Sequence, residues 1–527
     1  MNWSLMIMMM MMVIGLPCYG QSDLTARLKT QMGYLTSPEA GGRDAPGPNG
    51  DKVAQWVADR FREDGLLPAI IPMNYPIRQS SYFDSVQVIS AQLDPEFTKL
   101  WLYEKCENFV VTAEKYPDET EMRMMDRDYE TYLVGVDQKF VFGKDLYTFP
   151  RRINYFDRVE EKWVDCGYGL SLPEAGRNDY PADVLGKIAV VRPGSDLPAD
   201  KVGMRSGAAF KAAAAERAGA TALIVCYPDT ALWPPKELAG KIADLEKPLI
   251  DIPYSSSEFP IFYVRLAPGK NIATTFSDLF IRMKLGYQNR FEKSAINVVG
   301  MIPGSTDEWV IVGAHYDHLG EGFPGADDNA SGTVGLLELA RKWGRSGEVP
   351  KRGIIFVSFT CEEDGLLGSQ WFAQHLPFPL EKVVAMINLD MIGRDGFGSF
   401  RESMKPGATP TKGYAAAYFS APSPALKDIL RAASDGVDLQ TTVQPINSFR
   451  HFGDGAPFHE AGIPTVHIFS GFHADYHQQS DTPDKIDYVK LAKMIQLTDR
   501  SLRGLVEMGT RPGFDPTIKV ESGGMGY

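Results

Sequence analysis

The chain has few cysteines, five among 527 residues. If Cys18 leaves with a signal peptide, four remain, at positions 106, 166, 226 and 361, and none of them forms a CxxC pair. So few cysteines exclude a disulfide-rich scaffold, in which bridges compensate for a small hydrophobic core. We therefore expect free, buried cysteines, with a Cys166–Cys226 bridge as the alternative.

The chain also lacks the positive charge that is typical of nucleic-acid-binding proteins. It has 54 Lys and Arg against 67 Asp and Glu, a formal net charge of −13, and no Lys/Arg-rich run. Such an acidic chain repels phosphate backbones, so we expect no nucleic-acid partner. Hydrophobic residues make up 44% of the chain and charged residues 23%, which is typical of globular proteins and excludes extensive disorder. A chain of this length is expected to form about two to four domains.

Apolar runs long enough to cross a membrane as a helix are missing as well. The run Leu5–Leu16 has twelve residues, whereas a helical span needs about 20. Because this run lies in a charge-free N-terminal stretch, it predicts a secretory signal peptide at residues 1–20, cleaved after Gly20. A lipid anchor at Cys18, which Pro17 disfavours, and a buried N-terminal helix are the alternatives. We expect a soluble protein exported to the periplasm or the cell exterior, without a membrane span.

Residues 145–285 have the composition of a separate module. Short β-type runs at 186–194 and 221–229 flank an Ala-rich helix at Ser206–Ala218, and no cluster of His with carboxylates occurs there. We therefore expect this module to contribute no catalytic group. In residues 85–140 the apolar residues recur with no clear period, so no element is predicted there.

From residue 290 onward, apolar runs of strand length alternate with helical segments. The runs are Trp309–Ala314, Gly353–Phe359, Val383–Leu389 and Pro464–Phe469, and the helices are expected at 331–344, 365–376 and 488–507. Continuous apolar strands that alternate with helices predict a sheet covered by helices on both faces.

Histidine and carboxylate residues gather at the ends of these predicted strands. They are His315, Asp317 and His318 after the first run, Asp327 and Asp328 before the next helix, Glu362, Glu363 and Asp364 after the second run, Asp390 after the third, and His473, Asp475 and His477 after the fourth. Because ligands of open α/β sheets bind outside the carboxyl ends of strands, we expect these side chains to converge. Imidazoles among several carboxylates suit zinc. A bridging carboxylate would hold two ions around a shared water, and another would accept its proton.

Each of these features also has a structural explanation. A single His at a strand end is commonly structural, and paired acidic residues at a helix start are common as N-caps and as partners of the helix dipole. Five such sites at one edge of a sheet favour the metal interpretation jointly. A serine nucleophile fits less well, because no GxSxG elbow precedes a helix.

The motifs AHYDHLG, GADDNASG, CEEDGLLGS, NLDMIG and the late YH occur in this order. With them the chain resembles the di-zinc exopeptidases that include secreted bacterial aminopeptidases and glutamate carboxypeptidase II, and to which the transferrin receptor is an inactive relative. The resemblance covers nearly all of the mature chain, since GGRDAPGPNG and DGLLP also fit it, and residues 145–285 are similar to a protease-associated domain. It implies a three-layer α/β/α catalytic domain with a mixed, largely parallel central sheet, plus an inserted β-rich protease-associated domain.

The implied domain order has five parts. They are a signal peptide at 1–20, the first part of the catalytic domain at 22–125, the protease-associated insertion at 126–287, the second part of the catalytic domain at 288–510 and a C-terminal tail at 511–527.

The resemblance also implies two zinc ions per chain and a role for each site residue. His315 and Asp390 would hold one zinc, Glu363 and His477 the other, and Asp328 would bridge them. Asp328 is preferred to Asp327 because the family's bridging Asp lies three residues before the Ser of the Ser-Gly pair, here Ser331. Glu362 would be the general base, Asp317 would accept a hydrogen bond from the second nitrogen of His315, and Tyr476 would stabilise the oxyanion.

The chain departs from the family pattern at Gly453-Asp454, where relatives often have Ser-Asp near the substrate pocket, so substrate specificity does not carry over. We expect a secreted zinc-dependent exopeptidase, an aminopeptidase acting on peptide substrates. One alternative is a carboxypeptidase that removes acidic residues, for which Arg394, Arg401 and Arg450 are the candidate cations. A glutaminyl cyclase would normally keep one zinc, and a non-catalytic, transferrin-receptor-like binding protein would hold little zinc.

Overall fold

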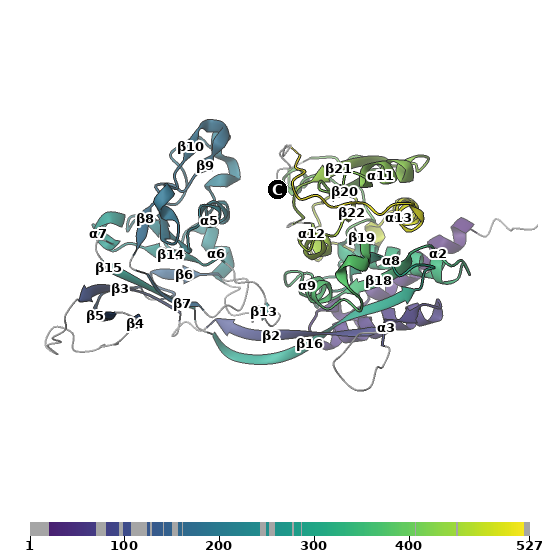
Figure 1. The fold of residues 1–527 in the computed structure, drawn as a ribbon, viewed down its shortest axis with the longest axis horizontal. Helices are drawn as coiled ribbons and strands as arrows, with labels where there is room; N and C mark the ends of the chain where they lie inside the picture. The colour runs from purple at the N-terminus through teal and green to yellow at the C-terminus, as the bar shows by residue number, and fades with distance from the viewer. Residues whose placement is uncertain are drawn as a thin grey trace, which may run out of the picture. The chain divides into compact units, whose positions relative to one another are not determined.

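The computed structural model shows two compact units, one formed by Met1–Val88 with Lys293–Tyr527 and the other by Ile89–Glu292 (Figure 1). The structure describes residues 20–69, 81–93, 98–106, 124–126, 129–140, 142–149, 156–160, 162–242, 249–251, 259–276, 279–285, 287–405, 407–449 and 452–520. Cys18 and, apart from Gly20, the expected signal peptide lie outside these residues. Across the described ranges, no helix combines the length and the apolar character needed to cross a membrane.

The first unit is built on a mixed β-sheet. Its strands lie in the order β2 (Phe83–Leu93), β16 (Tyr287–Ile302), β18 (Gly353–Phe359), β17 (Trp309–His315), β19 (Val383–Leu389), β22 (Thr465–Phe469), β20 (Tyr414–Ser420) and β21 (Gln440–Ile446), with β1 (Leu67–Pro68) paired to β16. The pairs β17–β18, β17–β19, β19–β22 and β20–β21 are parallel, whereas β16–β18 and β20–β22 are antiparallel. The prediction of a mixed, largely parallel sheet is confirmed.

Helices cover both faces of this sheet. They are α2 (Gly20–Leu35), α3 (Pro48–Glu63), α8 (Gly332–Gly344), α9 (Leu367–Gln374), α11 (Leu426–Ser434), α12 (Ala456–Glu460) and α13 (Tyr488–Glu507). Val310 and Val312 of β17 pack into one core with α2, α3, α8 and α13, whereas Ile311 packs into the other core with Phe372 of α9 and Phe458 of α12. Because successive strand residues point to opposite faces, a strand buried on both faces must be apolar throughout. The predicted three-layer arrangement is therefore present.

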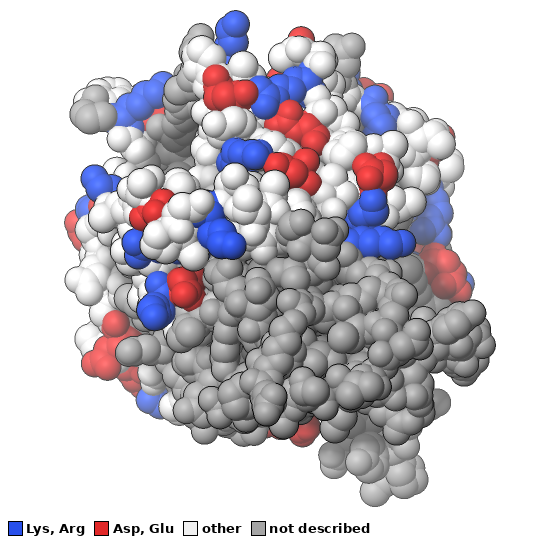
Figure 2. Space-filling model, turned by 90° about the vertical axis from the view of Figure 1, so that its left-hand side faces the viewer, with Lys and Arg blue, Asp and Glu red and all other residues white. Residues whose placement is uncertain are grey.

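The second unit contains two five-stranded sheets. One has the order β6 (Leu146–Thr148), β14 (Ile261–Arg265), β12 (Ala222–Tyr227), β11 (Ile188–Val191) and β8 (Trp163–Asp165), with α5 (Ala208–Arg217) packed against β12. The other has the order β4 (Met124–Asp126), β5 (Tyr129–Phe140), β3 (Lys99–Cys106), β15 (Leu279–Leu285) and β7 (Phe156–Glu160). Cys166, Cys226 and Cys361 are free and buried, so the alternative bridge between Cys166 and Cys226 is absent. Figure 2 shows acidic and basic side chains interspersed over the described surface of one face.

The boundaries of this unit differ from the sequence expectation. The structure divides the chain after Val88 and before Lys293, whereas the insertion was expected at 126–287. The reason is that β2 and β16 each run across a boundary as one continuous strand. Apolar periodicity reports a strand but not the point at which that strand leaves one unit for the other.

Candidate metal centre and active site

The expected site residues lie at the carboxyl ends of four adjacent parallel strands. His315 is the last residue of β17, Glu362 and Glu363 follow β18, Asp390 directly follows β19, and His477 lies in the loop after β22. These strands are neighbours in the order β18–β17–β19–β22, so their ends meet at one edge of the sheet.

Asp328 lies between the two histidines. Its Oδ1 atom is 3.6 Å from Nε2 of His315, and its Oδ2 atom is 3.1 Å from Nε2 of His477. Each carboxylate oxygen therefore faces a different imidazole. This is the arrangement expected of a carboxylate that bridges two metal ions.

Each histidine has a second carboxylate beside it. Oδ1 of Asp390 is 3.6 Å from Nε2 of His315, and Oε2 of Glu363 is 3.1 Å from Nε2 of His477. Ligand atoms on a tetrahedral zinc ion are about 3.3 Å apart when each bond is about 2.0 Å long. Oδ1 of Asp390 is also buried without a hydrogen-bond partner among the described residues. The pair His315 and Asp390 and the pair His477 and Glu363, each together with one oxygen of Asp328, therefore fit a zinc ion.

His318 is a site residue to which the sequence assigned no role. It lies within metal-binding reach of Asp328 and Glu363. Its Nδ1 atom, however, is 2.7 Å from Oε1 of Glu363, a hydrogen-bond distance, and 4.0 Å from Oδ2 of Asp328. His318 therefore holds the oxygen of Glu363 that does not face His477, and His477 remains the better ligand.

The carboxylates make this edge of the sheet attractive to positive charge. Burial alone would raise the pKa of Glu363, but His318 and His477 beside it outweigh burial and hold that pKa below its usual value. Burial opposes protonation of His477, yet Asp328 and Glu363 raise its pKa to about 10. A site that favours a proton so strongly also favours a bound cation.

Glu362 has the properties of a general base that is not a ligand. Its Oε2 atom lies 4.0 Å from Nε2 of His315, farther than either carboxylate that faces this nitrogen. Burial raises the pKa of Glu362 well above its usual value, and the carboxylates of Glu363, Asp454 and Asp390 add to the rise. A raised pKa brings a carboxylate closer to the working range of a proton acceptor near neutral pH.

Residues 297–500 match peptidase family M28. These residues are called the M28 part below. The M28 part contains every residue expected to bind metal and Glu362.

Several relatives carry aminopeptidase names. The chain is 31% identical over 224 residues to leucine aminopeptidase 2 of Trichophyton rubrum, covering 42% of this chain and 40% of that protein. It is 27% identical over 368 residues to aminopeptidase YwaD of Bacillus subtilis, covering 67% of this chain and 70% of that protein. A solved aminopeptidase from Aneurinibacillus sp. strain AM-1 aligns with 94% of this chain and 96% of its own, at 20% identity and a TM-score of 0.47. The chain spans about half or less of the length of several curated relatives.

The structure places Asp317 of the M28 part differently from the sequence expectation. His315 Nδ1 lies 3.2 Å from the backbone oxygen of Asp317 but 3.8 Å from its carboxylate. The carboxylate instead accepts a hydrogen bond from the backbone N–H of Glu363 at 3.2 Å. The residue therefore positions His315 through its backbone oxygen and Glu363 through its side chain.

The loops of the M28 site are held by a buried polar network. Oδ2 of Asp481 accepts hydrogen bonds from the backbone N–H groups of Asp327 and Asp328, at 2.8 and 3.1 Å. The carboxylate of Asp327 accepts from the backbone N–H of Gly393 and lies 3.2 Å from Nε2 of His473. The carboxylate of Asp327 therefore already has partners in this network, which supports Asp328 as the bridging residue.

Arg43 attaches the N-terminal segment to the M28 site. Its guanidinium is fully buried and donates hydrogen bonds to the backbone oxygens of Leu35, Tyr316, Pro324, Gly325 and Asp328. Burial lowers the pKa of Arg43 to about 10, and the carboxylates of Asp328, Asp317, Asp481 and Glu363 partly offset the effect. The sequence showed GGRDAPGPNG as a loop but gave no sign that its arginine reaches the metal-binding loops.

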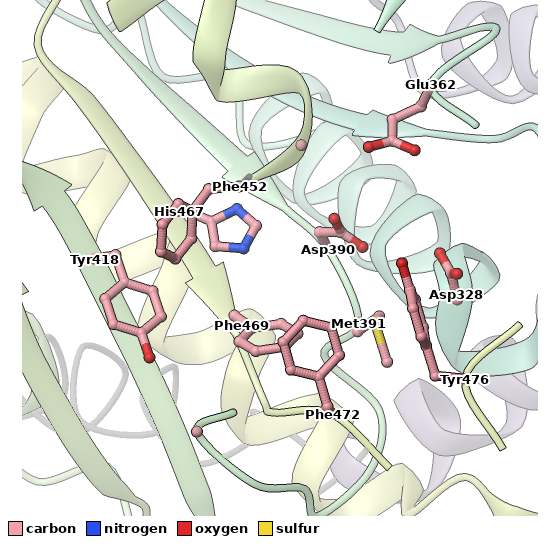
Figure 3. Close-up of a pocket in the computed structure, with 12 residues that line it drawn as sticks. Asp328, Glu362, Asp390, Met391, Tyr418, Phe452, His467, Phe469, Phe472 and Tyr476 are labelled. Atoms are coloured by element: carbon pink, nitrogen blue, oxygen red, sulfur yellow. The ribbon is translucent and has the colours of Figure 1, made fainter. Parts of the chain in front are cut away.

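A cavity opens beside the metal-binding residues (Figure 3). It is lined by Asp328, Glu362, Asp390, Met391, Gly398, Tyr418, Phe452, Gly453, His467, Phe469, Phe472 and Tyr476. Carboxylates occupy one side, and the side chains of Tyr418, Phe452, His467 and Phe469 occupy the other. An apolar lining with a few convergent polar groups is typical of small-ligand sites.

Tyr476, which the resemblance implies as the group that stabilises the oxyanion, lines the cavity and lies against His477. The two rings stack with centroids 3.8 Å apart. Burial and the carboxylates of Asp328 and Glu362 raise the pKa of the Tyr476 hydroxyl. It therefore stays protonated and can donate a hydrogen bond to an oxygen in the cavity.

The Gly453-Asp454 departure has a steric basis. Gly453 has a φ of +60°, and a Cβ there would lie 3.0 Å from Oδ2 of Asp390 and 3.1 Å from Nδ2 of Asn388. Asp454 is fully buried, and burial raises its pKa to about 7. Gly453 therefore leaves room for Asp390, while Asp454 is a further carboxyl group that raises the pKa of Glu362 and to which the sequence assigned no role.

Of the candidate cations of the carboxypeptidase alternative, Arg394 is the one whose side chain the structure describes, and it does not line the cavity. No Lys or Arg occurs among the described lining residues. Arg394 pairs with Asp475 at 2.8 Å and with Asp481 at 3.3 Å. Arg450 lies outside the described residues, as does the side chain of Arg401.

Proposed function

We propose that the protein is an aminopeptidase that binds two zinc ions and removes N-terminal residues from peptides. The observation that carries the proposal is the position of Asp328, whose two carboxylate oxygens face His315 and His477 separately. His315 and Asp390 would complete one site, and His477 and Glu363 the other. The match of residues 297–500 to peptidase family M28 and the aminopeptidase names of the relatives support it.

The protein side chains would divide the proton transfers between them. Zinc bound at these residues supplies a water of lowered pKa and polarises the substrate carbonyl. Glu362 would accept the proton of the attacking water and deliver it to the leaving nitrogen. Tyr476 would donate a hydrogen bond to the carbonyl oxygen as negative charge develops there.

The charge of the cavity favours an amino terminus over a carboxyl terminus. Its charged lining residues are Asp328, Glu362 and Asp390, and the described lining offers no cation to a substrate carboxylate. A protonated α-amine would be attracted to these carboxylates, whereas a C-terminal carboxylate would be repelled.

The other side of the cavity favours an apolar N-terminal side chain. Tyr418, Phe452 and Phe469 present aromatic rings there, and burial lowers the pKa of His467 to about 4, so that this imidazole is neutral. Relatives named leucine aminopeptidase fit this chemistry. We therefore expect Leu, Phe or Met to be preferred to Asp or Lys at the substrate N-terminus.

The test is a set of leucine substrates that differ at their ends. Purified protein is stripped with a chelator, reloaded with zinc and given leucinamide, N-acetyl-leucinamide and N-acetyl-Ala-Leu. Hydrolysis of leucinamide alone, with about two zinc ions per chain by elemental analysis, supports the proposal. Release of leucine from N-acetyl-Ala-Leu supports the carboxypeptidase instead. A folded protein with little zinc and no hydrolysis supports a non-catalytic binding protein.

Export and the role of the second unit belong to the same proposal. The charge-free apolar N-terminus supports cleavage of a signal peptide after Gly20, and N-terminal sequencing of secreted protein would test it. The second unit, with sheets of its own, would act as the protease-associated domain that shapes access to the site.

A further inference from the structure

The aromatic lining of the cavity continues outward to the protein surface. Tyr418, Phe452 and Phe469 are buried, Phe472 and Tyr476 are half-buried, and the side chain of Phe400 is 38% exposed. Neighbouring rings lie 5.0 Å apart in Phe469–Phe472 and 5.3 Å apart in Phe472–Tyr476. Because burial decreases along this series of rings, the cavity has a closed inner end at the buried rings and an open outer end at the exposed ring of Phe400.

Phe400 extends this aromatic series beyond the cavity. Its ring meets the rings of Phe472 and Tyr476 edge to face, with both centroid distances at 5.8 Å. Met404, 59% exposed, follows one helical turn later, and its backbone N–H donates to the oxygen of Phe400. Residues four apart on a helical turn share a face, so Phe400 and Met404 form one apolar rim, here called the outer rim.

The outer rim is attached firmly to the loop that carries the catalytic tyrosine. Phe397 and Phe472 exchange backbone hydrogen bonds of 2.8 and 2.9 Å. Gly396 approaches Gly471 so closely that a Cβ on Gly396 would lie 2.4 Å from the backbone carbon of Gly471. Ser399 accepts a hydrogen bond from the N–H of Glu402 and so caps α10 (Phe400–Ser403). The large apolar side chains of Phe400 and Met404 are thus fixed in solvent-exposed positions beside a binding cavity, as is typical of a ligand-binding surface.

We propose that the outer rim is a subsite for the side chain of the second substrate residue, the one after the scissile bond, and that it selects an apolar side chain. The inference rests on the proposed aminopeptidase function. With the N-terminal side chain in the closed aromatic end, the rest of the peptide must leave through the open end. Tyr476 lies between the closed end and the open end of the cavity. The residue after the cleaved bond therefore passes over Phe400 and Met404.

The test compares leucyl-leucinamide with leucyl-glycinamide, which share the N-terminal residue and differ only at the second. The wild-type kcat/KM should be higher for leucyl-leucinamide. Phe400→Ala and Met404→Ala should each reduce that preference, about fivefold for Phe400→Ala, because a hydrophobic contact of this size discriminates about tenfold or more when fully buried. Val349→Ala is the matched control, since Val349 is 73% exposed and lies before the amino-terminal end of β18, whereas the site lies at the carboxyl ends of the strands.

A charge reversal keeps the test informative if removal of the ring perturbs folding. Phe400→Lys should raise the rate on leucyl-glutamate amide relative to leucyl-lysine amide, compared with wild type. An unchanged preference in both Phe400 variants would overturn the inference. Equal losses on all second residues would also overturn it, because Phe400 would then only support Tyr476. Failure of wild-type protein to cleave either dipeptide amide would instead overturn the proposed function.

Discussion

The imidazole of His318 lies 2.7 Å from the carboxylate of Glu363, through its Nδ1 and Oε1 atoms. The other oxygen of Glu363, Oε2, lies 3.1 Å from Nε2 of His477. Glu363 is thus fixed from both sides by two different imidazoles. A ligand whose free oxygen is held in this way keeps the second oxygen aimed at the metal, which is how neighbouring groups tune a metal site.

His318→Ala should weaken zinc binding at the site of Glu363 and His477 without emptying the other site. Loss of such a supporting group typically lowers metal affinity by about 10- to 100-fold. Zinc-to-protein ratios measured against a competing chelator would show one weakened site of the two. His375→Ala is the control, because His375 is exposed and contacts Trp371 outside the site. Loss of both sites in His318→Ala would contradict the supporting role.

Glu362→Gln should keep both metals and the fold while kcat falls by about 10²- to 10⁴-fold, because an amide cannot accept the proton of the attacking water. Leucinamide hydrolysis and zinc content would be measured on the same preparation, with the exposed Glu348→Gln as control. A variant with both zinc ions and more than about a tenth of the wild-type rate would show that another group is the base.

Asp328→Asn should lower occupancy of both zinc sites, whereas His477→Ala should empty mainly one. The reason is that Asp328 faces both histidines through separate oxygens. Asp327→Asn is the matched comparison, since its carboxylate is directed to Gly393 and His473 instead. Metal-to-protein ratios after dialysis decide between them, and a double loss confined to Asp327→Asn would move the bridge to Asp327.

The central strands, and the site residues at their carboxyl ends, could be predicted from the sequence for a physical reason. Strands β17, β18 and β19 are covered on both faces, so each is a continuous apolar run that ends where the chain reaches solvent and the site begins. Helices α8 and α13 were also expected close to their observed bounds. The edge of the sheet was missed, because β20 is Ala-rich, a composition that favours helices over strands, and β21 is half-exposed and gives no continuous apolar run.

The supporting residues of the site could not be predicted in the same way. Arg43 reaches five backbone oxygens, four of them distant in sequence, and backbone acceptors leave no residue pattern. Asp317 supports the site through its own backbone oxygen, for which the residue type gives no signal. His318 stood in the motif HYDH, but its sequence position alone could not show which carboxylate it would meet.

Lowering the pH should destabilise the protein through His467. Burial lowers the pKa of this imidazole to about 4, below its usual value of about 6.5. Between these values the unfolded chain binds a proton that the folded protein does not, so the free energy of unfolding decreases as pH falls, by about 1.4 kcal/mol per pH unit. His467→Gln should flatten this dependence. Urea unfolding of zinc-free wild type and variant at about pH 7 and about pH 5 measures it, and equal slopes would show that His467 does not titrate in this range.

Asp481→Ala should lower zinc affinity although Asp481 is not a ligand. Its Oδ2 atom accepts the backbone N–H groups of Asp327 and Asp328, so its loss frees the segment that presents the bridging carboxylate and leaves two buried donors unpaired. Asp475→Ala is the matched control, because Asp475 also pairs with Arg394 but accepts neither of these N–H groups. Asp481→Ala should therefore show weaker binding of both zinc ions and a lower kcat/KM that excess zinc partly restores, while Asp475→Ala should keep its zinc. If the two variants lost zinc equally, the ion pairs of Arg394 would be the important contacts, and the backbone hydrogen bonds to Asp481 would not position Asp328.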